Sequence, residues 1–401
     1  MLTFSFLLLF VYTVSFCSVK QKELSQIESK YSIDLDGKQE ASIPLSTYFK
    51  SVKPIILETN KDCLIGDIHE FQVFDGCIYI FDIRAAKSLY VFDMDGRFIR
   101  KIGSLGNGPG EYIQLSDFTL DTENRFIYLL DYGQRIHKYH LDGTFVQTIT
   151  PKVQNSNIHY IQYYDSRLYM SILAYKPALN DYMLLETDLD NGEILSKSLP
   201  LKYNKGWAEL MSIGHSFFMS RLNAPPLYSQ IFMDYVVSVG KDITPYIELK
   251  SKNLVTDKNL ENINDREDAR TMVRKFREYF HGSSKIFDVN SYVENDEFII
   301  FRYQQGFMNY NIVIIHKKTG SVELVKKFSK DLIFKNSENR YFGGFVFSDT
   351  KGAYEFLNTM SIAGFQESIR NNEVVPELDK ADELHQLEED ANPIIFYYEY
   401  K

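Results

Sequence analysis

Two short segments carry glycines and acidic residues at spacings that occur in nucleotide and calcium sites. Residues 103–110 contain four glycines, but a dinucleotide-binding fingerprint requires a strand, a glycine turn and then a helix. Pro109 and a further apolar strand follow here, so the segment predicts a tight turn. Residues 188–193, DLDNGE, begin like a calcium loop, yet Leu199 stands where that loop needs a bidentate Glu. A hairpin turn is therefore predicted at this place.

A set of cations and tyrosines recurs at the ends of apolar segments along the chain. Cations gathered around one opening would focus an anionic ligand, and tyrosine rings would offer flat contacts to a sugar or an aromatic group. Loops are polar in any protein, so solvation alone also accounts for such a set. The candidate ligand-binding residues are Arg84, Lys87, Tyr132, Arg135, Tyr175, Lys176, Arg221, Arg302 and Tyr303.

Motifs for nucleophilic or metal-dependent catalysis are absent from the sequence. It contains neither G-x-S-x-G nor H-E-x-x-H. His137 and His140 stand three apart on an expected strand, so their side chains point to opposite faces and cannot chelate one ion. We therefore predict no catalytic residue, no metal site and no cofactor from these patterns.

The first sixteen residues have the character of a targeting segment. MLTFSFLLLFVYTVSF carries no charge and is shorter than the roughly 20 apolar residues that span a bilayer, so it suits the core of a secretory signal. Cys17 follows directly, which predicts lipidation of its thiol. Phe16 stands where a small residue is expected, so cleavage after Cys17 is the alternative. Both predict export to the periplasm or outer membrane, with membrane contact only through an N-terminal lipid.

The composition is that of a soluble globular chain rich in β-forming residues. Of 401 residues, 44% are hydrophobic and 15% aromatic, and the formal net charge is -10. Aromatic side chains fit pleated, half-buried surfaces. An acidic chain without a Lys/Arg-rich run lacks the cations that neutralise phosphates, so no nucleic acid partner is expected. Cys63 and Cys77 form no C-x-x-C pair; free thiols are expected, with a disulfide in an oxidising compartment as the alternative.

The elements that carry these residues follow one repeated pattern. An apolar strand ending in Asp, as in residues 78–82, is followed by a turn, a second strand, a tight turn and a third strand. Asp-Gly and Asn-Gly pairs in the tight turns are strong hairpin signals. A period of about 40–50 residues with several strands per copy is typical of a β-propeller, whose blades bury their faces by stacking. The turn glycines Gly96, Gly143, Gly192 and Gly240 lie 47, 49 and 48 residues apart.

Six copies predict an all-β fold, a six-bladed β-propeller with short helical insertions. The sixth copy lacks strands; PIILET at 54–59 and PIIFYYEY at 393–400 would supply them and close the ring with both chain ends. The expected organisation is a signal peptide at 1–17, an N-terminal segment at 18–53 and the propeller at 54–401. Innermost strands are expected to begin near Ile68, Ser116, His159, Ser212, Val289 and Gly343.

Two insertions, at about 257–282 and 359–391, are expected to be helical. Residues 265–280 place apolar side chains at helical spacing, and 361–370 with 376–390 form a second, acidic pair. In a four-stranded blade, the loop after the second strand and the connection to the next blade emerge on the same face. Both insertions occupy such positions, so we expect either local packing on the rim or a lid over one face.

Four segments resemble the six-bladed β-propeller lipoproteins of gut Gram-negative bacteria. They are LIGDI at 64–68, FDMDGRFIRKIG at 92–103, GNGPGEY at 106–112 and DANPIIFYYEYK at 390–401. Residues 101–121, in which a glycine-rich turn leads into the next innermost strand, resemble an NHL-type repeat. The resemblance covers about 31–401 and implies the fold, export and usually a lipid anchor. It implies no catalytic residues.

Two functions of different classes are compatible with the sequence. The first is an exported, envelope-anchored, non-enzymatic binding or scaffold protein, whose partner is an unidentified protein, a glycan or an anionic small molecule. The second is a hydrolase or lyase with a site on the propeller axis, where a metal would need Glu, Asn and Asp from several inner strands. Carboxylates converging on the axis would favour the enzyme, and an open aromatic or basic face would favour the binding protein.

Overall fold

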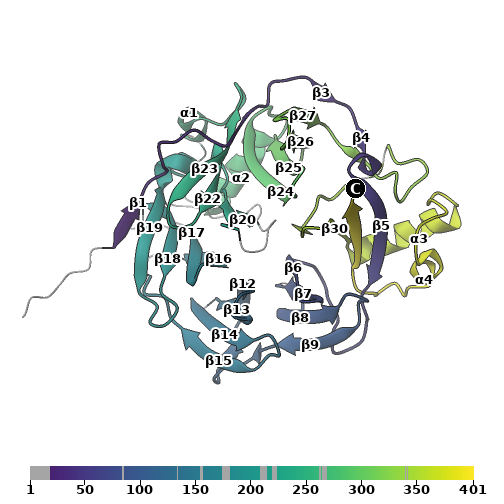
Figure 1. Cartoon of the computed structure of the whole chain (residues 1–401), viewed down its shortest axis with the longest axis horizontal. Helices are drawn as coiled ribbons and strands as arrows, with labels where there is room; N and C mark the ends of the chain where they lie inside the picture. The colour runs from purple at the N-terminus through teal and green to yellow at the C-terminus, as the bar shows by residue number, and fades with distance from the viewer. Residues whose placement is uncertain are drawn as a thin grey trace, which may run out of the picture.

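Six sheets of four or five strands stand around one axis and form a six-bladed β-propeller (Figure 1). The computed structural model describes residues 19–401 except 84, 133, 154–156, 174–180, 208–214, 219–223, 262, 264–268, 339 and 341. The apolar faces of neighbouring blades meet in shared clusters; Phe81 of the first blade, for example, packs edge-to-face on Phe118 of the second. The predicted all-β propeller is confirmed.

Each blade has four antiparallel strands that run from the axis to the rim. Blade one contains β6 (Glu70–Phe74), β7 (Cys77–Asp82), β8 (Ser88–Asp93) and β9 (Phe98–Ile102). Blade two contains β12 (Leu115–Asp121), β13 (Phe126–Asp131), β14 (Arg135–His140) and β15 (Phe145–Ile149). The short strands β10 (Ser104–Leu105) and β11 (Glu111–Tyr112) pair in the connection between these blades. Blade three contains β16 (Asn157–Tyr164), β17 (Arg167–Leu173), β18 (Tyr182–Thr187) and β19 (Ile194–Pro200).

The remaining blades follow the same order with one exception at the end of the chain. Blade four contains β20 (Phe217–Phe218), β21 (Leu227–Tyr228), β22 (Tyr235–Val239) and β23 (Ile243–Lys250). Blade five contains β24 (Ile286–Glu294), β25 (Phe298–Gln305), β26 (Tyr310–His316) and β27 (Val322–Val325). Blade six contains β29 (Phe347–Ser348), β30 (Gly352–Leu357), β31 (Ile394–Tyr400) and β5 (Phe49–Ile56). The exception is β5, which comes from the other end of the chain.

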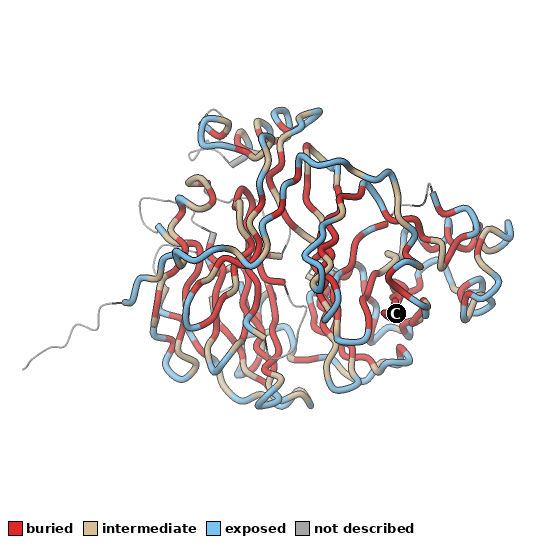
Figure 2. The backbone as a smooth tube through the Cα atoms, turned by 45° about the horizontal axis from the view of Figure 1, so that its top comes forward, coloured by how far each residue is buried: buried red, intermediate tan, exposed pale blue. Residues whose placement is uncertain are grey.

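The repeat period predicted the positions of the strands closely. Innermost strands begin at Glu70, Leu115, Asn157, Phe217, Ile286 and Phe347, near the six expected starts. The turn glycines at 96, 143, 192 and 320 have φ between 71° and 90°, the left-handed region that residues with a Cβ avoid. The strands contain most of the buried residues, whereas the turns between them are exposed (Figure 2).

Blade four differs from the expected arrangement. The innermost strand, expected to begin near Ser212, is β20, which begins at Phe217, and β21 is the second strand. Both strands have only two residues, so they are too short for a strand-period pattern to identify them. Gly240 lies in the turn between β22 and β23, but it has no positive φ.

The ring closes as predicted, with strands from both chain ends. β31 pairs antiparallel with β5, and Phe396 lies opposite Pro54. β5 begins at Phe49, earlier than the expected PIILET strand. Phe49 is fully buried and its ring stacks on Tyr400, the last residue of β31. The two termini of the propeller are thus held together by backbone pairing and by a shared apolar core.

The residues before β5 form an N-terminal belt, defined here as residues 20–44. Its strands add parallel to the outer edges of blades three, four and five, which extends those sheets beyond four strands. Ile33 is buried between blades four and five. The segment preceding residue 54 is therefore part of the propeller. The belt strands are β1 (Lys20–Lys22), β2 (Tyr31–Asp34), β3 (Gln39–Glu40) and β4 (Ile43–Pro44), which pairs with β28 (Phe328–Ser329), and the 3-10 turn η1 (Leu45–Thr47) follows.

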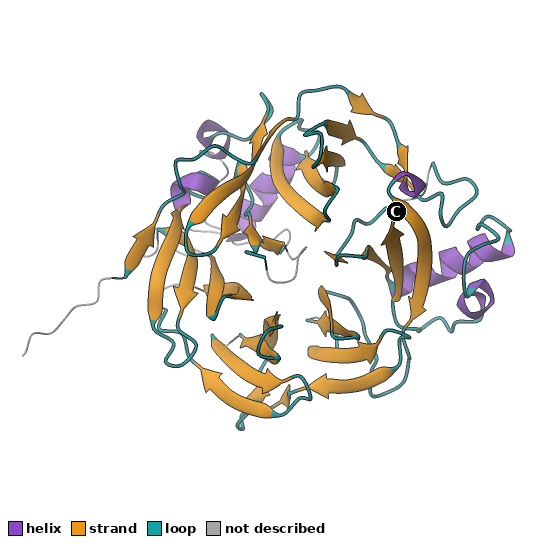
Figure 3. Ribbon diagram, in the orientation of Figure 1, coloured by secondary structure: helices purple, strands orange, loops and turns teal. Residues whose placement is uncertain are grey.

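Both insertions contain helices, and none of these lies over the centre of the propeller (Figure 3). In this view the helices of the first insertion overlap blades four and five, and those of the second lie outside the ring. The first insertion contains α1 (Asp257–Leu260) and α2 (Ala269–Phe280), whose Phe276 and Phe280 pack on Phe287. In the second, η3 (Thr359–Ser361) leads into α3 (Ile362–Arg370), outside β5. The expected helix at 376–390 is reduced to α4 (Ala381–His385). This arrangement agrees with packing on the rim and contradicts a lid.

Two further features bear on the expectations from the sequence. Cys63 and Cys77 are free thiols, as expected. Among residues 19–401, with the gaps given above, no helix is long and apolar enough to cross a membrane. Residues 1–18, which include the expected targeting segment and Cys17, lie outside the described residues. The short turn η2 (Leu201–Asn204) follows blade three.

Candidate functional site

A cavity of about 290 Å³ opens on the propeller axis. Blades one, four, five and six line it, because their innermost strands begin around it. Its aromatic lining includes Phe71, Phe217 and Phe345, and its polar lining is contributed by Glu70, Gln72, His215, Asn290, Ser291 and Arg302. This cavity is the place where side chains of different blades can act on one ligand.

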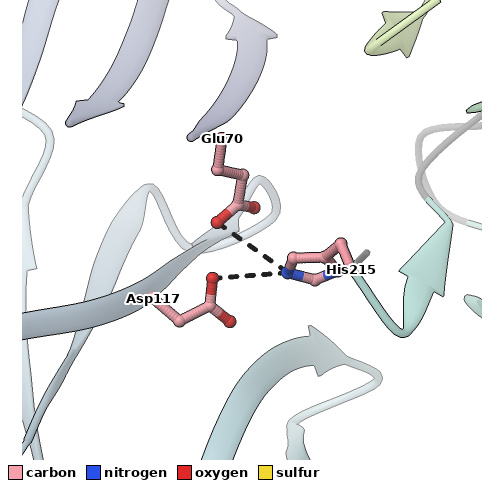
Figure 4. Close-up of side chains that lie close together, drawn as sticks. All are labelled: Glu70, Asp117 and His215. Atoms are coloured by element: carbon pink, nitrogen blue, oxygen red, sulfur yellow. Dashed lines mark hydrogen bonds and ion pairs between the residues drawn. The ribbon is translucent and has the colours of Figure 1, made fainter. Parts of the chain in front are cut away.

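Three ionisable side chains from different blades lie close together at this cavity (Figure 4); two of them, Glu70 and His215, line it, and the third is buried behind them. Glu70 is the first residue of β6, Asp117 lies on β12, and His215 precedes β20 by two residues. Nε2 of His215 is 3.3 Å from Oδ1 of Asp117 and 3.9 Å from Oε2 of Glu70. One ligand atom from each residue lies within 4.8 Å of the others. We refer to these three residues as the axial triad.

Local irregularities of the inner strands aim these side chains. The register of β12 shifts between Leu115 and Asp117, and a β-bulge of this kind redirects the side chain that follows it. Asp117 is then held by the backbone N–H of Ile161, which donates to Oδ2 over 2.6 Å. Gln72 Nε2 donates to Oε1 of Glu70 over 2.9 Å. Each carboxylate thus keeps one oxygen fixed and turns the other toward His215.

Burial shapes the electrostatics of the axial triad. The side chain of Asp117 is fully buried, and burial raises its pKa to about 7. Burial and the charge of Asp117 raise the pKa of Glu70 well above its ordinary value. Burial lowers the pKa of His215, which the negative charge of Glu70 opposes. Two adjacent carboxylates in this environment need a proton or a cation to compensate their charge.

Arg302 forms another part of the cavity wall. Nε of Arg302 donates to Oδ1 of Asn290 over 3.2 Å, and its guanidinium carbon lies 4.7 Å from the ring centre of Tyr310. Gly344 permits this placement, because a Cβ there would lie 2.6 Å from the guanidinium carbon. The register of β24 shifts between Asn290 and Val293, which brings Ser291 to the cavity as well. The wall therefore combines a positive group with the acidic triad.

Those residues expected to bind ligand that the structure describes do not gather around the cavity as one ring. Arg302 lines the cavity, whereas Lys87 and Tyr132 are exposed in loops that do not line it. Arg135 pairs with the buried carboxylate of Asp131, so its charge is already compensated. Tyr303 is wrong as a contact surface, since it is fully buried and its hydroxyl accepts from Gln39. Arg84, Tyr175, Lys176 and Arg221 lie outside the described residues.

Reasoning from the sequence missed the axial triad. No local motif joins the three residues, because they are far apart in the chain and come from three blades. One signal was available: Glu70 and Asp117 lie 47 residues apart, the same interval as Gly96 and Gly143. Equivalent positions of successive repeats stack beside one another in a propeller. Aligning the copies would have placed these two carboxylates together, although not His215.

Comparison with protein families and solved structures agrees with this fold. Residues 30–399 match a family described as a domain of unknown function, DUF4934. No curated protein matches the sequence significantly. A crystal structure of a candidate exported protein from Bacteroides fragilis superposes with a TM-score of 0.73 at 17% identity, covering 92% of this chain and 99% of that one. A DUF4221 family member from Bacteroides vulgatus gives a TM-score of 0.51 at 10% identity, covering 88% and 97%.

Proposed function

This chain belongs to the DUF4934 family, and from that premise we propose that it is an exported, non-enzymatic β-propeller that binds a small anionic ligand in its axial cavity. The observation that carries the proposal is Arg302, a cation held on the cavity wall by Asn290 and Tyr310. A guanidinium is the preferred partner of carboxylate and phosphate groups. Beside it, the buried Oγ of Ser291 has no hydrogen-bond partner among the described residues, so it can serve a ligand.

The aromatic side chains that line the cavity indicate a second chemical feature of the proposed ligand. Phe71, Phe217 and Phe345 face the same cavity as Arg302. Aromatic faces contact the apolar faces of sugar rings and of aromatic groups. A sugar acid or an aromatic acid combines both features and fits about 290 Å³, close to the lower end of the usual range for small-molecule sites.

Binding can be tested with a defined panel of acids. We expect glucuronate, galacturonate, citrate or benzoate to raise the melting temperature of the purified chain. Arg302→Gln removes the cation and should abolish that rise. Arg125→Gln is the matched control, because Arg125 is exposed and pairs with Asp75 at the surface. If no acid has an effect, or if Arg302→Gln responds like the wild type, ligand binding at this cavity is refuted.

Export is the second component of the proposal. It is supported by the uncharged apolar segment that precedes Cys17 and by the exported class assigned to the Bacteroides fragilis protein. We place the mature protein in the periplasm or at the outer membrane, with a lipid on Cys17. Cys17→Ala should release the protein from the membrane fraction into the soluble envelope fraction. Recovery of the uncleaved chain in the cytoplasm would contradict export.

The alternative function is a hydrolase or lyase acting on the axis. The specific observation in its favour is the axial triad, because carboxylates do converge there. Asp117 and Glu70 could exchange protons with a bound substrate. An assay of the purified chain against ester, lactone and uronate-polymer substrates tests this function. Activity that Asp117→Asn abolishes would favour the enzyme over the binding protein.

A further inference from the structure

The axial triad offers three donor atoms of the kinds that bind metal ions. Nε2 of His215 is an imidazole nitrogen, and Glu70 and Asp117 each present a carboxylate oxygen. We propose that these three side chains bind a divalent transition-metal ion, with zinc as the best fit. An imidazole with two carboxylates suits zinc, which is bound in catalytic sites by three protein ligands and one open position.

The spacing of the donor atoms agrees with one shared ion. Ligands placed about 2.1 Å from a tetrahedral zinc ion lie about 3.4 Å from each other. Nε2 of His215 is 3.3 Å from the Asp117 oxygen and 3.9 Å from the Glu70 oxygen. Only small side-chain adjustments would bring all three atoms to coordination distance.

A second layer of contacts holds each proposed ligand. Gln72 fixes Oε1 of Glu70, and the Ile161 backbone fixes Oδ2 of Asp117. Nδ1 of His215 lies 3.0 Å from the carbonyl oxygen of Phe217 and 3.1 Å from the backbone nitrogen of the same residue. The proposed site requires the tautomer in which Nδ1 carries the proton and donates it to that carbonyl, because the lone pair of Nε2 then points toward the carboxylates. Metal-binding histidines are oriented in this manner by a carbonyl or carboxylate.

Unsatisfied polar atoms at the site also indicate a missing cation. Oε2 of Glu70 is buried and, when Asp117 is also ionised, receives no hydrogen bond from any described residue. Gln72 is 2% exposed, and its Oε1 likewise has no partner in the described part of the chain. Buried polar atoms are nearly always paired in folded proteins. An ion bound to Glu70, with a water in its open position, would supply the missing interactions.

The proposed ion deepens the proposed function, on which this part of the inference rests. The ion would lie on the wall of the cavity that Arg302 also lines. Its open coordination position would face that cavity. An acidic ligand would then contact the ion with one oxygen and Arg302 with another group, which explains how an acid can bind beside two carboxylates.

The inference can be tested by measuring metal content and affinity without any organic ligand. The purified chain is stripped with a chelator, and zinc is returned by titration. We expect about one zinc per chain, and cobalt in the same site should give a visible absorption band. Glu70→Gln, Asp117→Asn and His215→Gln should each lower zinc affinity by about 100-fold or more, and Gln72→Leu by about 10- to 100-fold.

Matched controls carry the same changes at exposed positions. They are Glu123→Gln, Asp190→Asn and His281→Gln, and each should bind zinc like the wild type. Circular dichroism identifies variants that have lost their fold. The number of zinc ions bound by the wild type tests the proposal even if a variant misfolds. The proposal is overturned if the folded wild type binds no zinc, or if folded triad variants bind it equally well. Zinc binding is measured in the absence of any acid, and the acid response is tested separately by Arg302→Gln, so a failure of one proposal is distinguishable from a failure of the other.

Discussion

Asn392 is a single residue that joins the two ends of the propeller. It is 2% exposed and lies just before β31. Its Nδ2 donates to the carbonyl oxygens of Glu58 and Cys63, over 2.7 and 2.8 Å. Its Oδ1 accepts from the backbone N–H of Ile65 over 2.7 Å. One amide side chain thus satisfies three backbone groups in the connection from β5 to blade one.

Replacing Asn392 should therefore be costly. Asn392→Asp presents an acceptor to two carbonyl oxygens and leaves both without a donor. Unpaired buried groups cost about 1–3 kcal/mol each, so we expect the free energy of unfolding to fall by about 2–5 kcal/mol. Urea denaturation measures the loss. The control Asn371→Asp is exposed and should change stability very little; equal losses for both variants would contradict the role of Asn392.

The carboxyl group of Asp288 leads to a prediction about how the stability of the protein depends on pH. Burial raises its pKa to about 6, while the side chain of Asn290 donates to it and opposes the rise. Between about pH 4 and pH 6 the folded state binds more protons than the unfolded state, so this residue lowers stability as pH rises. Asp288→Asn should stabilise the protein by about 2–3 kcal/mol at pH 8 and by almost nothing at pH 4. Melting curves at both pH values measure this; a constant difference would refute it.

At the scale of elements, the aspartates that end the second strands tie two loops together. Asp82 is fully buried at the end of β7. Its carboxylate accepts from the N–H groups of Gly66 and Ala85, over 2.7 and 2.9 Å. Gly66 lies in the connection from blade six, and Ala85 in the loop after the second strand. Asp131 makes the corresponding contacts in blade two, with the N–H groups of Ile113 and Gln114.

Asp82→Ala removes the acceptor that these loops share. Several N–H groups then lose a charged partner, and we expect the free energy of unfolding to fall by about 2–4 kcal/mol. Denaturation and hydrogen exchange of residues 64–68 report the global and the local effect. Asp95→Ala, at an exposed position of the same blade, is the control. Unchanged exchange in the Asp82 variant would show that the loops hold their shape by other contacts.

The repeat made the elements predictable, and its weakest copy shows where prediction fails. The turn glycines of blades one, two, three and five have the left-handed backbone that explains their spacing. In blade four the first two strands have two residues each, too few for alternation to be visible. The axial triad was not predictable in full, because His215 belongs to that irregular copy. Arg302 could be placed on the second strand of its blade because it follows a regular apolar pattern, and it lies within β25. The burial of Tyr303 depends on the neighbouring blade, which the pattern does not show.

At the scale of the whole molecule, the N-terminal belt covers the outer edges of three blades. An uncovered edge strand exposes unpaired backbone groups and invites association with other chains. Lys22 of β1 also pairs with Glu186 of blade three over 2.7 Å, with both side chains largely buried. The belt therefore contributes apolar burial, backbone pairing and a partly buried ion pair.

Ile33 is the residue that tests the belt. It is 1% exposed in the cluster between blades four and five, and Ile33→Ala should lower the free energy of unfolding by about 2–4 kcal/mol. Ile27 is 60% exposed in the same belt, so Ile27→Ala should cost less than about 0.5 kcal/mol. Urea denaturation distinguishes them. A neutral Ile33→Ala would mean that the belt contributes little to the stability of the folded ring.

The pairing of β5 with β31 has a consequence for the order of events during biosynthesis. Residues 49–56 are synthesised well before their partner strand, residues 394–400. Contacts between such distant parts of a chain slow folding, because the intervening segment must first be brought together. Until residues 394–400 have been synthesised, blade six lacks its third strand and β5 has no strand to pair with. A chain that stops before Ile394 lacks the strand that pairs with β5, so blade six cannot form and the ring cannot close.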